Sequence, residues 1–279
     1  MRRAVLGVVM LMGMCAGVWA QASALPSAQS DAPGTVNTAK RGRALMDSMV
    51  TALGGEAWLG RKDWKIEGRF ATFYKGLPHD EVPQFVEYYR AQPFGERIIM
   101  ISHFGVFIAT NHADVAEVWT GDTGYEVTYK GSKVLPAKDV DEYMRRRRYS
   151  LDAVVGWLKD GNVQAIYEGP ATESRHLAEK VSVLTPKNDV VTLMLDASTH
   201  LPLSLTYQWR DPLYQDLNTD VVQFDDYHVI QGIQTPFSIT HLHNGDMVSQ
   251  RFVTKVAYNL SLPDDLFDPA RPLSKGTSK

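Results

Sequence analysis

The residues whose types and spacing could do chemistry are two histidines, His241 and His243, in the segment THLHNGD. In a strand they would share one face, because side chains alternate with period two, and Asp246 lies close by in the chain. Such a His-x-His pair with a third ligand can bind zinc. The same face also carries Phe237 and Ile239, which fits a sheet rim equally well. We therefore predict no metal and no other cofactor, and retain a metal-dependent hydrolase as the third functional hypothesis.

Other catalytic patterns are missing from the sequence. It contains no G-x-S-x-G nucleophile elbow, no S-x-x-K and no correctly spaced glycine-rich phosphate loop. Two carboxylate pairs occur, Asp225-Asp226 and Asp264-Asp265. Adjacent residues of a strand point to opposite faces, so Asp225 and Asp226 are badly placed to act together as acid and base. We predict no catalytic residues and no enzymatic activity.

The densest charge run is Arg145 to Arg148. Four successive helical residues sweep roughly 300° around the axis, so Arg147 or Arg148 should lie on or beside the apolar face of its helix. There it would need an acidic or phosphate partner, or would extend to solvent. We predict that Arg147 and Arg148 serve a lid or bind an anionic head group. A solvated helix face and attraction to anionic membrane are the alternatives.

The first residues have the pattern of a secretory signal peptide, with two arginines, an apolar run from residue 4 to about 20, and small residues after it. We predict a signal at 1–20, a periplasmic protein, and no transmembrane segment once it is cleaved. Cys15, the only cysteine, follows Met14 where a lipoprotein signal needs a small residue, so lipid anchoring there is not expected. The mature chain would have no thiol. Losing two arginines takes the formal charge from −3 to −5, which argues against nucleic-acid binding.

Hydrophobic periodicity divides the rest of the chain. Residues 21–40 are small and polar and predict a flexible tether. Leu45, Met49 and Leu53 then recur at helical spacing, and a second helical segment at 137–161 divides at Ser150, a candidate cap. Period-two alternation elsewhere predicts half-buried antiparallel strands in one large curved sheet or barrel. The predicted strands are 63–74, 84–91, 96–102, 106–110, 115–120, 124–131, 162–168, 178–185, 190–196, 203–210, 218–225, 236–243 and 251–260.

A resemblance to the LolA/LolB-like lipoprotein-carrier superfamily rests on turn motifs between about Val118 and Pro272. The segment FDDYHVIQGIQTPFSIT is similar to a hairpin of that family, and the matching residues are Phe224, Tyr227, Gly232, Ile233, Pro236, Phe237 and Ile239. The segments VWTGDTGYEVTYKG, LMLDASTHLPLSLTY and VAYNLSLPDDLFDPARP resemble three further family segments. The resemblance implies a half-open antiparallel β-barrel, mainly β with helices plugging an apolar cavity that takes acyl chains. The domain would span 41–272, with a disordered tail at 273–279.

The abundant aromatic residues would either fill an ordinary core or line a cavity too wide to fill itself. For the cavity we predict a lining of Trp64, Phe70, Tyr88, Ile99, Phe107 and Trp119. The first functional hypothesis is thus a non-catalytic periplasmic binder or carrier of lipid or lipid-modified protein, with acyl chains as ligand and an envelope protein complex as a possible partner. The second is a protein-interaction or envelope-sensor module that uses the same fold.

Overall fold

The structure is a computed structural model that describes residues 36–79, 82–104 and 110–273. These residues belong to one compact unit spanning 31–279. The predicted signal peptide, residues 21–35 of the predicted tether, and Phe107 with most of the predicted strand at 106–110 lie outside the described residues. Within the described residues, no helix is long and apolar enough to cross a membrane.

The described part of the chain is mainly β. Its helices are α1 (Val36–Leu53), α2 (Glu56–Leu59), α3 (Ala137–Arg148), α4 (Leu151–Trp157) and the 3-10 helix η1 (Asp264–Phe267). Its strands are β1 (Asp63–Tyr74), β2 (Leu77–Pro78), β3 (Gln84–Arg90), β4 (Gly95–Phe104), β5 (Thr110–Thr120), β6 (Thr123–Thr128), β7 (Gly131–Val134), β8 (Gln164–Glu173), β9 (His176–Leu184), β10 (Val190–Asp196), β11 (Pro202–Arg210), β12 (Leu217–Ile230), β13 (Ile233–His243) and β14 (Asp246–Tyr258).

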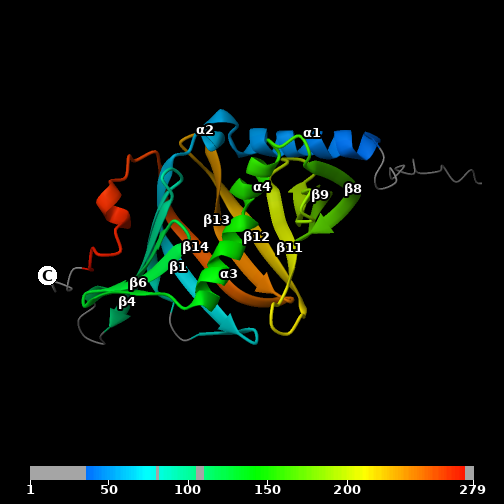
Figure 1. Cartoon of the computed structure of the whole chain (residues 1–279). Coiled ribbons are helices and arrows are strands. Elements are labelled where there is room, and N and C mark those ends of the chain that lie inside the picture. The colour runs from blue at the N-terminus through cyan, green and yellow to red at the C-terminus, as the bar shows by residue number, and fades with distance from the viewer. Residues whose placement is uncertain (1–35, 80–81, 105–109, 274–279) are drawn as a thin grey trace, which may run out of the picture. The chain divides into compact units, whose positions relative to one another are not determined.

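All of these strands form one antiparallel sheet, in the order β7-β6-β5-β4-β3-β1-β14-β13-β12-β11-β10-β9-β8, with β2 paired to β1. β7 and β8 end this order, and among the described residues no pairing joins them, so the sheet is open. The prediction of one large antiparallel sheet is confirmed. The chain crosses from one open edge to the other through α3 and α4, and α3 runs across the sheet (Figure 1).

Helix α1 covers the β8 end of the sheet. Its buried residues recur every three or four positions and so form one stripe: Thr38, Gly42, Leu45, Met46, Met49 and Leu53. A Cβ atom at Gly42 would lie 2.3 Å from a main-chain oxygen of β8, so the glycine permits this close approach. The helix begins at Val36, so residues 36–40, which the sequence predicts as part of the tether, are helical.

The second helical segment divides as the sequence predicts. α3 ends at Arg148 and α4 begins at Leu151, and the Ser150 hydroxyl accepts a hydrogen bond from the Ala153 amide at 3.3 Å. This bond satisfies one of the free amides at the start of α4. The break between the two helices therefore has a local cause.

The C-terminal segment, residues 264–273, covers one face of β4. The Arg97 guanidinium donates to the carbonyl oxygens of Leu266 and Arg271, at 3.3 and 3.2 Å. Phe267 and Leu273 are 5 and 8 % exposed, and Leu273 packs into a small apolar cluster on β5 and β6. This cover explains why β4 is apolar on both faces, as the sequence indicated. Leu273, the first residue of the tail predicted at 273–279, is packed, and residues 274–279 lie outside the described residues.

The hairpin between β12 and β13 confirms the turn predicted from FDDYHVIQGIQTPFSIT. Gln231 and Gly232 form its two-residue loop, with φ angles of 52° and 81°. Positive φ at both loop residues suits the twist of a hairpin. The Tyr227 hydroxyl donates to the Pro202 carbonyl oxygen at 2.7 Å, which ties β12 to the start of β11. This segment has a structural role.

Candidate ligand-binding site

A row of large side chains lies beneath α3 on strands β1, β3, β4 and β5. The register places Trp64 of β1 opposite Tyr89 of β3. Tyr89 lies opposite Glu96 of β4, which lies opposite Trp119 of β5. Residues directly opposite in an antiparallel pair share a face. Tyr143 of α3 stacks on Trp119, with ring centroids 3.6 Å apart, so this is the face that α3 covers. We call it the α3 face.

A buried ion pair lies on the α3 face beside this row. Glu87 accepts a hydrogen bond from Trp64 Nε1 at 3.0 Å and pairs with Arg251 of β14. Its side chain is 6 % exposed, so this carboxylate depends on both partners. The Trp64 ring stacks almost parallel on Tyr89 at 3.9 Å. The α3 face is therefore aromatic and charged, rather than purely apolar.

Glu96 links the sheet to α3, because it accepts a hydrogen bond from the Tyr143 hydroxyl. Burial, reinforced by the negative charge of Glu87, raises the pKa of Glu96 to about 8, while the Tyr143 hydrogen bond acts in the opposite direction. Burial also raises the pKa of Tyr89 to about 12. Glu96 is therefore mostly protonated at neutral pH, which lowers the charge beneath α3.

The α3 face continues on the other half of the sheet around Asp220 of β12. His241 Nε2 and His243 Nδ1 lie 3.0 and 3.1 Å from the same Asp220 oxygen, and Trp209 Nε1 donates to the other oxygen. Burial would raise the pKa of Asp220, but hydrogen bonds from the two histidines and Trp209 lower it to about 2. In the part of the chain that the structure describes, no three His, Cys, Asp or Glu residues are arranged to hold a metal.

The two predicted lid residues have different environments. Arg148 forms an ion pair with Asp189 at 2.7 Å, in the loop before β10. The Arg147 guanidinium lies 3.4 Å from the centre of the Phe94 ring, a cation–π contact. Arg148 thus has the acidic partner that the prediction calls for, whereas Arg147 contacts an aromatic ring. Their role toward a lid or head group stays a prediction.

Sequence reasoning missed Arg145. Its guanidinium lies 3.4 Å from the centre of the Trp209 ring, and its Nε atom is buried with no hydrogen-bond partner in the described residues. It also missed Glu87 and Glu96, because a single acidic residue inside an alternating strand has the signature of a solvent-facing position. The run of four arginines was a real signal, but the choice among them depends on how α3 is rotated.

The residues predicted to line a cavity divide between the two faces. Trp64, Phe70 and Trp119 belong to the α3 face, since Trp64 and Phe70 alternate on β1. Tyr88 and Ile99 lie on the opposite face: Tyr88 neighbours Tyr89 in β3, and Ile99 packs into the cluster covered by the C-terminal segment. Adjacent strand residues point to opposite faces, so the predicted lining residues do not all share one face, and their role in lining a cavity stays a prediction. Phe107 lies outside the described residues.

The comparisons with known proteins identify the fold. No family model matches the chain, and no curated protein matches it. A DUF1329 family protein from Desulfovibrio piger superposes with a TM-score of 0.55 at 13 % identity, over 83 % of this chain and 97 % of that one. A putative outer membrane lipoprotein-sorting protein domain from Vibrio parahaemolyticus gives 0.50 at 8 % identity, over 82 % and 97 %. A LolA superfamily protein from Nitrosomonas europaea gives 0.49 at 10 % identity, over 83 % and 97 %. The chain has a LolA/LolB-like fold.

Proposed function

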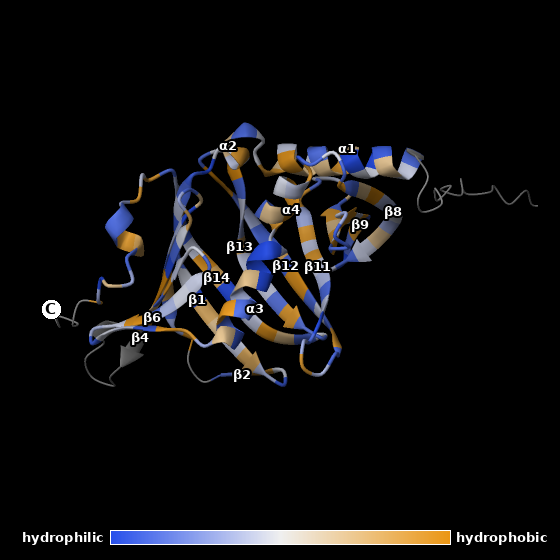
Figure 2. Cartoon of the chain, in the orientation of Figure 1, coloured by the Kyte–Doolittle hydropathy of each residue, from blue (hydrophilic) through white to orange (hydrophobic). Residues whose placement is uncertain are grey.

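We propose that this protein is an exported, non-catalytic binder of lipid or lipid-modified protein, and that acyl chains bind on the α3 face once α3 moves aside. The observation that carries the proposal is how α3 is held. All residues of α3 are described, and Tyr143 alone among them is buried. Figure 2 shows hydrophilic colour over the arginine end of this helix. An aliphatic seam would make α3 a permanent part of the core.

Several polar or aromatic contacts hold α3. They are the Tyr143–Trp119 stack, the hydrogen bond to Glu96, the two arginine–ring contacts and the Arg148–Asp189 pair. Contacts of these kinds contribute about 0.5 to 1.5 kcal/mol each, and the most exposed ion pairs less. Burying acyl chains contributes about 0.8 kcal/mol for each CH₂ group, so a chain of ordinary length can compensate for their loss.

Displacing α3 would expose the ligand-binding surface that the proposal requires. Trp119 is 2 % exposed and Phe85 is 2 % exposed, and both lie on the α3 face with Trp64. Aromatic side chains of this size provide large apolar areas for a flexible chain. The similarity to a lipoprotein-sorting domain supports this proposal at the level of fold.

The test combines co-purified lipid with a binding probe. The mature protein is purified from a bacterial envelope and analysed by native mass spectrometry, and a fluorescent fatty acid is titrated into delipidated protein. Tyr143→Phe keeps the stack on Trp119 but removes the hydrogen bond to Glu96, so α3 should open more easily. A loss of about 1 kcal/mol would raise the probe association rate about fivefold.

The matched control is Tyr88→Phe, which makes the same chemical change on the opposite face and should leave the rate unchanged. If no lipid co-purifies and the probe shows no saturable binding to the wild-type protein, the carrier function is wrong. If both variants accelerate binding equally, the ligand does not enter beneath α3.

A further inference from the structure

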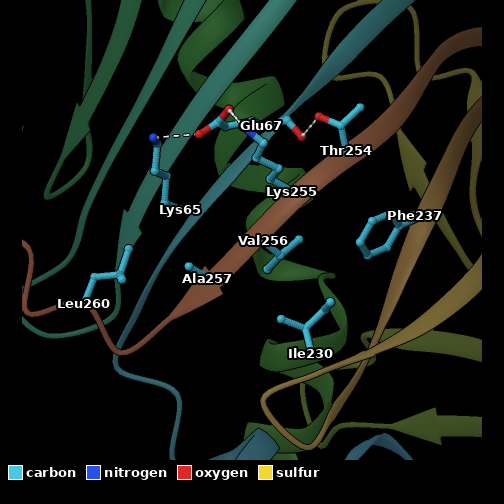
Figure 3. A pocket seen from close by; sticks show the side chains of 9 residues that line it. All are labelled: Lys65, Glu67, Ile230, Phe237, Thr254, Lys255, Val256, Ala257 and Leu260. Carbon is cyan, nitrogen blue, oxygen red and sulfur yellow. Dashed lines mark hydrogen bonds and ion pairs between the residues drawn. The ribbon is translucent and has the colours of Figure 1, made fainter.

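Strands β13 and β14 pair near the turn that joins them and separate along the rest of their length. They pair from Ser238, which lies opposite Phe252, down to the turn that joins them. Beyond that point Ile233–Phe237 and Val253–Tyr258 have no ladder partner in each other among the described residues, although β13 still pairs with β12 and β14 with β1. Figure 3 shows the two ribbons diverging there. We call this opening the β13–β14 split.

The far end of the split is closed by a side chain in place of a strand. Gln231 Oε1 accepts from the Tyr258 amide at 2.7 Å, and Gln231 Nε2 donates to the Tyr258 carbonyl at 3.3 Å. The main chain of Tyr258 therefore points into the split. Main-chain groups alternate along a strand, so the amide and carbonyl of Val256 point the same way. They are available to a partner.

The two rims of the split differ in what they offer. On β13, Pro236 lies within the unpaired stretch and has no amide hydrogen to donate. On β14, Val256 offers both a donor and an acceptor. An added strand would therefore pair with β14, and β13 would contribute side chains.

The split coincides with a groove of about 510 Å³ (Figure 3). Ile230, Phe237, Val256, Ala257 and Leu260 provide its apolar lining. The open stretch of β14 between Phe252 and Tyr258 has five residues, about 17 Å at 3.3 Å per residue. This length suits an extended peptide of four or five residues.

The charges at the groove favour an acidic occupant. Lys65 Nζ lies 2.7 Å from one Glu67 oxygen, and Lys255 Nζ lies 3.7 Å from the other. Two ammonium groups thus share one carboxylate, and the Lys255 side chain is 77 % exposed. One positive charge remains in excess at the rim.

We propose that the β13–β14 split binds an extended peptide of a partner protein, which adds a strand to β14 at Val256 and places an acidic side chain beside Lys255. Strand addition uses main-chain hydrogen bonds for affinity and side-chain pockets for selectivity. An acyl chain in this groove would leave the amide and carbonyl of Val256 unpaired, at a cost of about 1 to 3 kcal/mol each where they are desolvated. The geometry thus favours a peptide over a lipid.

The test uses the full chain and a fluorescein-labelled, capped hexapeptide, Val-Thr-Val-Glu-Val-Thr. Fluorescence anisotropy should show saturable binding, and hydrogen exchange should show protection of the Val256 amide when the peptide is added. Two N-methylated peptides, each blocking alternate amides, separate strand pairing from apolar adhesion. One of them should bind about fivefold more weakly, since it loses the hydrogen bond to the Val256 carbonyl, which contributes about 1 kcal/mol. The other should bind like the parent.

Lys255→Glu should weaken the peptide about fivefold, while Lys130→Glu, an exposed lysine at the β6–β7 turn, should have no effect. Both variants change exposed residues, so their folding can be checked by circular dichroism. No saturable binding up to about 1 mM, or equal binding of all three peptides, would overturn the proposal. Displacement of the peptide by a fatty acid would also overturn it, because the groove would then be a lipid site.

Discussion

Replacing Glu96 with glutamine should remove a large part of the pH dependence of stability. The pKa of this carboxyl rises from its ordinary value of 4.5 to about 8 in the folded protein, chiefly through burial. Each pKa unit corresponds to about 1.4 kcal/mol, which gives an upper limit of about 5 kcal/mol. Glu96 is half-buried, so screening by solvent reduces the expected effect to about 2 kcal/mol.

The sign follows from the direction of the shift. Below pH 4.5 both the folded and the unfolded states hold the proton, and the contribution of Glu96 is fully present. As the pH rises toward 8, the unfolded state loses the proton while the folded state keeps it, so stability falls. Above pH 8 both states are ionised and the curve becomes flat. Glu96→Gln has no proton to lose at this position.

The assay is urea denaturation of the wild-type protein and Glu96→Gln at half-unit steps from pH 4 to 9. Subtracting the two curves cancels the other titrating groups, and the free-energy difference should change by about 2 kcal/mol across that range. Tyr143→Phe provides a second check, since it removes a hydrogen bond that lowers the pKa of Glu96 and should move the transition to higher pH. Parallel curves for the wild-type protein and Glu96→Gln would refute the burial of Glu96 beneath α3.

Two further predictions concern the helices. Gly42→Ala should lower the free energy of unfolding by about 1 to 3 kcal/mol, because the added Cβ would collide with the main chain of β8. Gly156→Ala, where nothing lies within 4 Å of the added Cβ, should raise the free energy of unfolding by up to about 1 kcal/mol. Thermal unfolding measures both variants, and equal effects would contradict the packing of α1. Arg148→Met should cost under about 1 kcal/mol and Arg146→Met less, since the Arg148 partner Asp189 is only 13 % exposed. Burial would raise the pKa of Asp189, but the hydrogen bond from Arg148 helps to lower it in the folded protein. The ion pair therefore stabilises the protein above the unfolded-state pKa of Asp189, and this stabilisation is lost as the pH falls through the folded-state pKa. A cost of Arg148→Met that persists in acid would exclude the ion pair as its cause.

Much of the fold is readable from local pattern. The period-two alternation of β1 and β11 predicts strands with one wet face, and the apolar run of β4 predicts cover on both faces. Ser150 predicts the break between α3 and α4 through its capping chemistry. These features depend on residues close together in the chain, which is why sequence reasoning finds them. The start of α1 was placed too late, because the buried Thr38 resembles the polar residues around it.

The candidate site is much less readable. In β3, Tyr88 and Tyr89 are adjacent and aromatic, and the pattern alone does not say which of them faces α3. Pairing with Trp64 decides in favour of Tyr89. Glu87 and Glu96 look like surface residues until the register and α3 enclose them.

The sequence by itself determined most of the strands, the hairpin loop at Gln231-Gly232, the two helical interruptions and the resemblance to a carrier fold, because each follows from local periodicity or turn chemistry. The tertiary structure alone decided which side chains share a face, since β1 pairs with β14 across nearly two hundred residues and its register shifts between Glu67 and Gly68. It also decided that β13 and β14 separate between Ser238 and the hairpin that joins β12 to β13. A one-residue change of register exchanges the two faces of a strand, and only long-range packing selects between them.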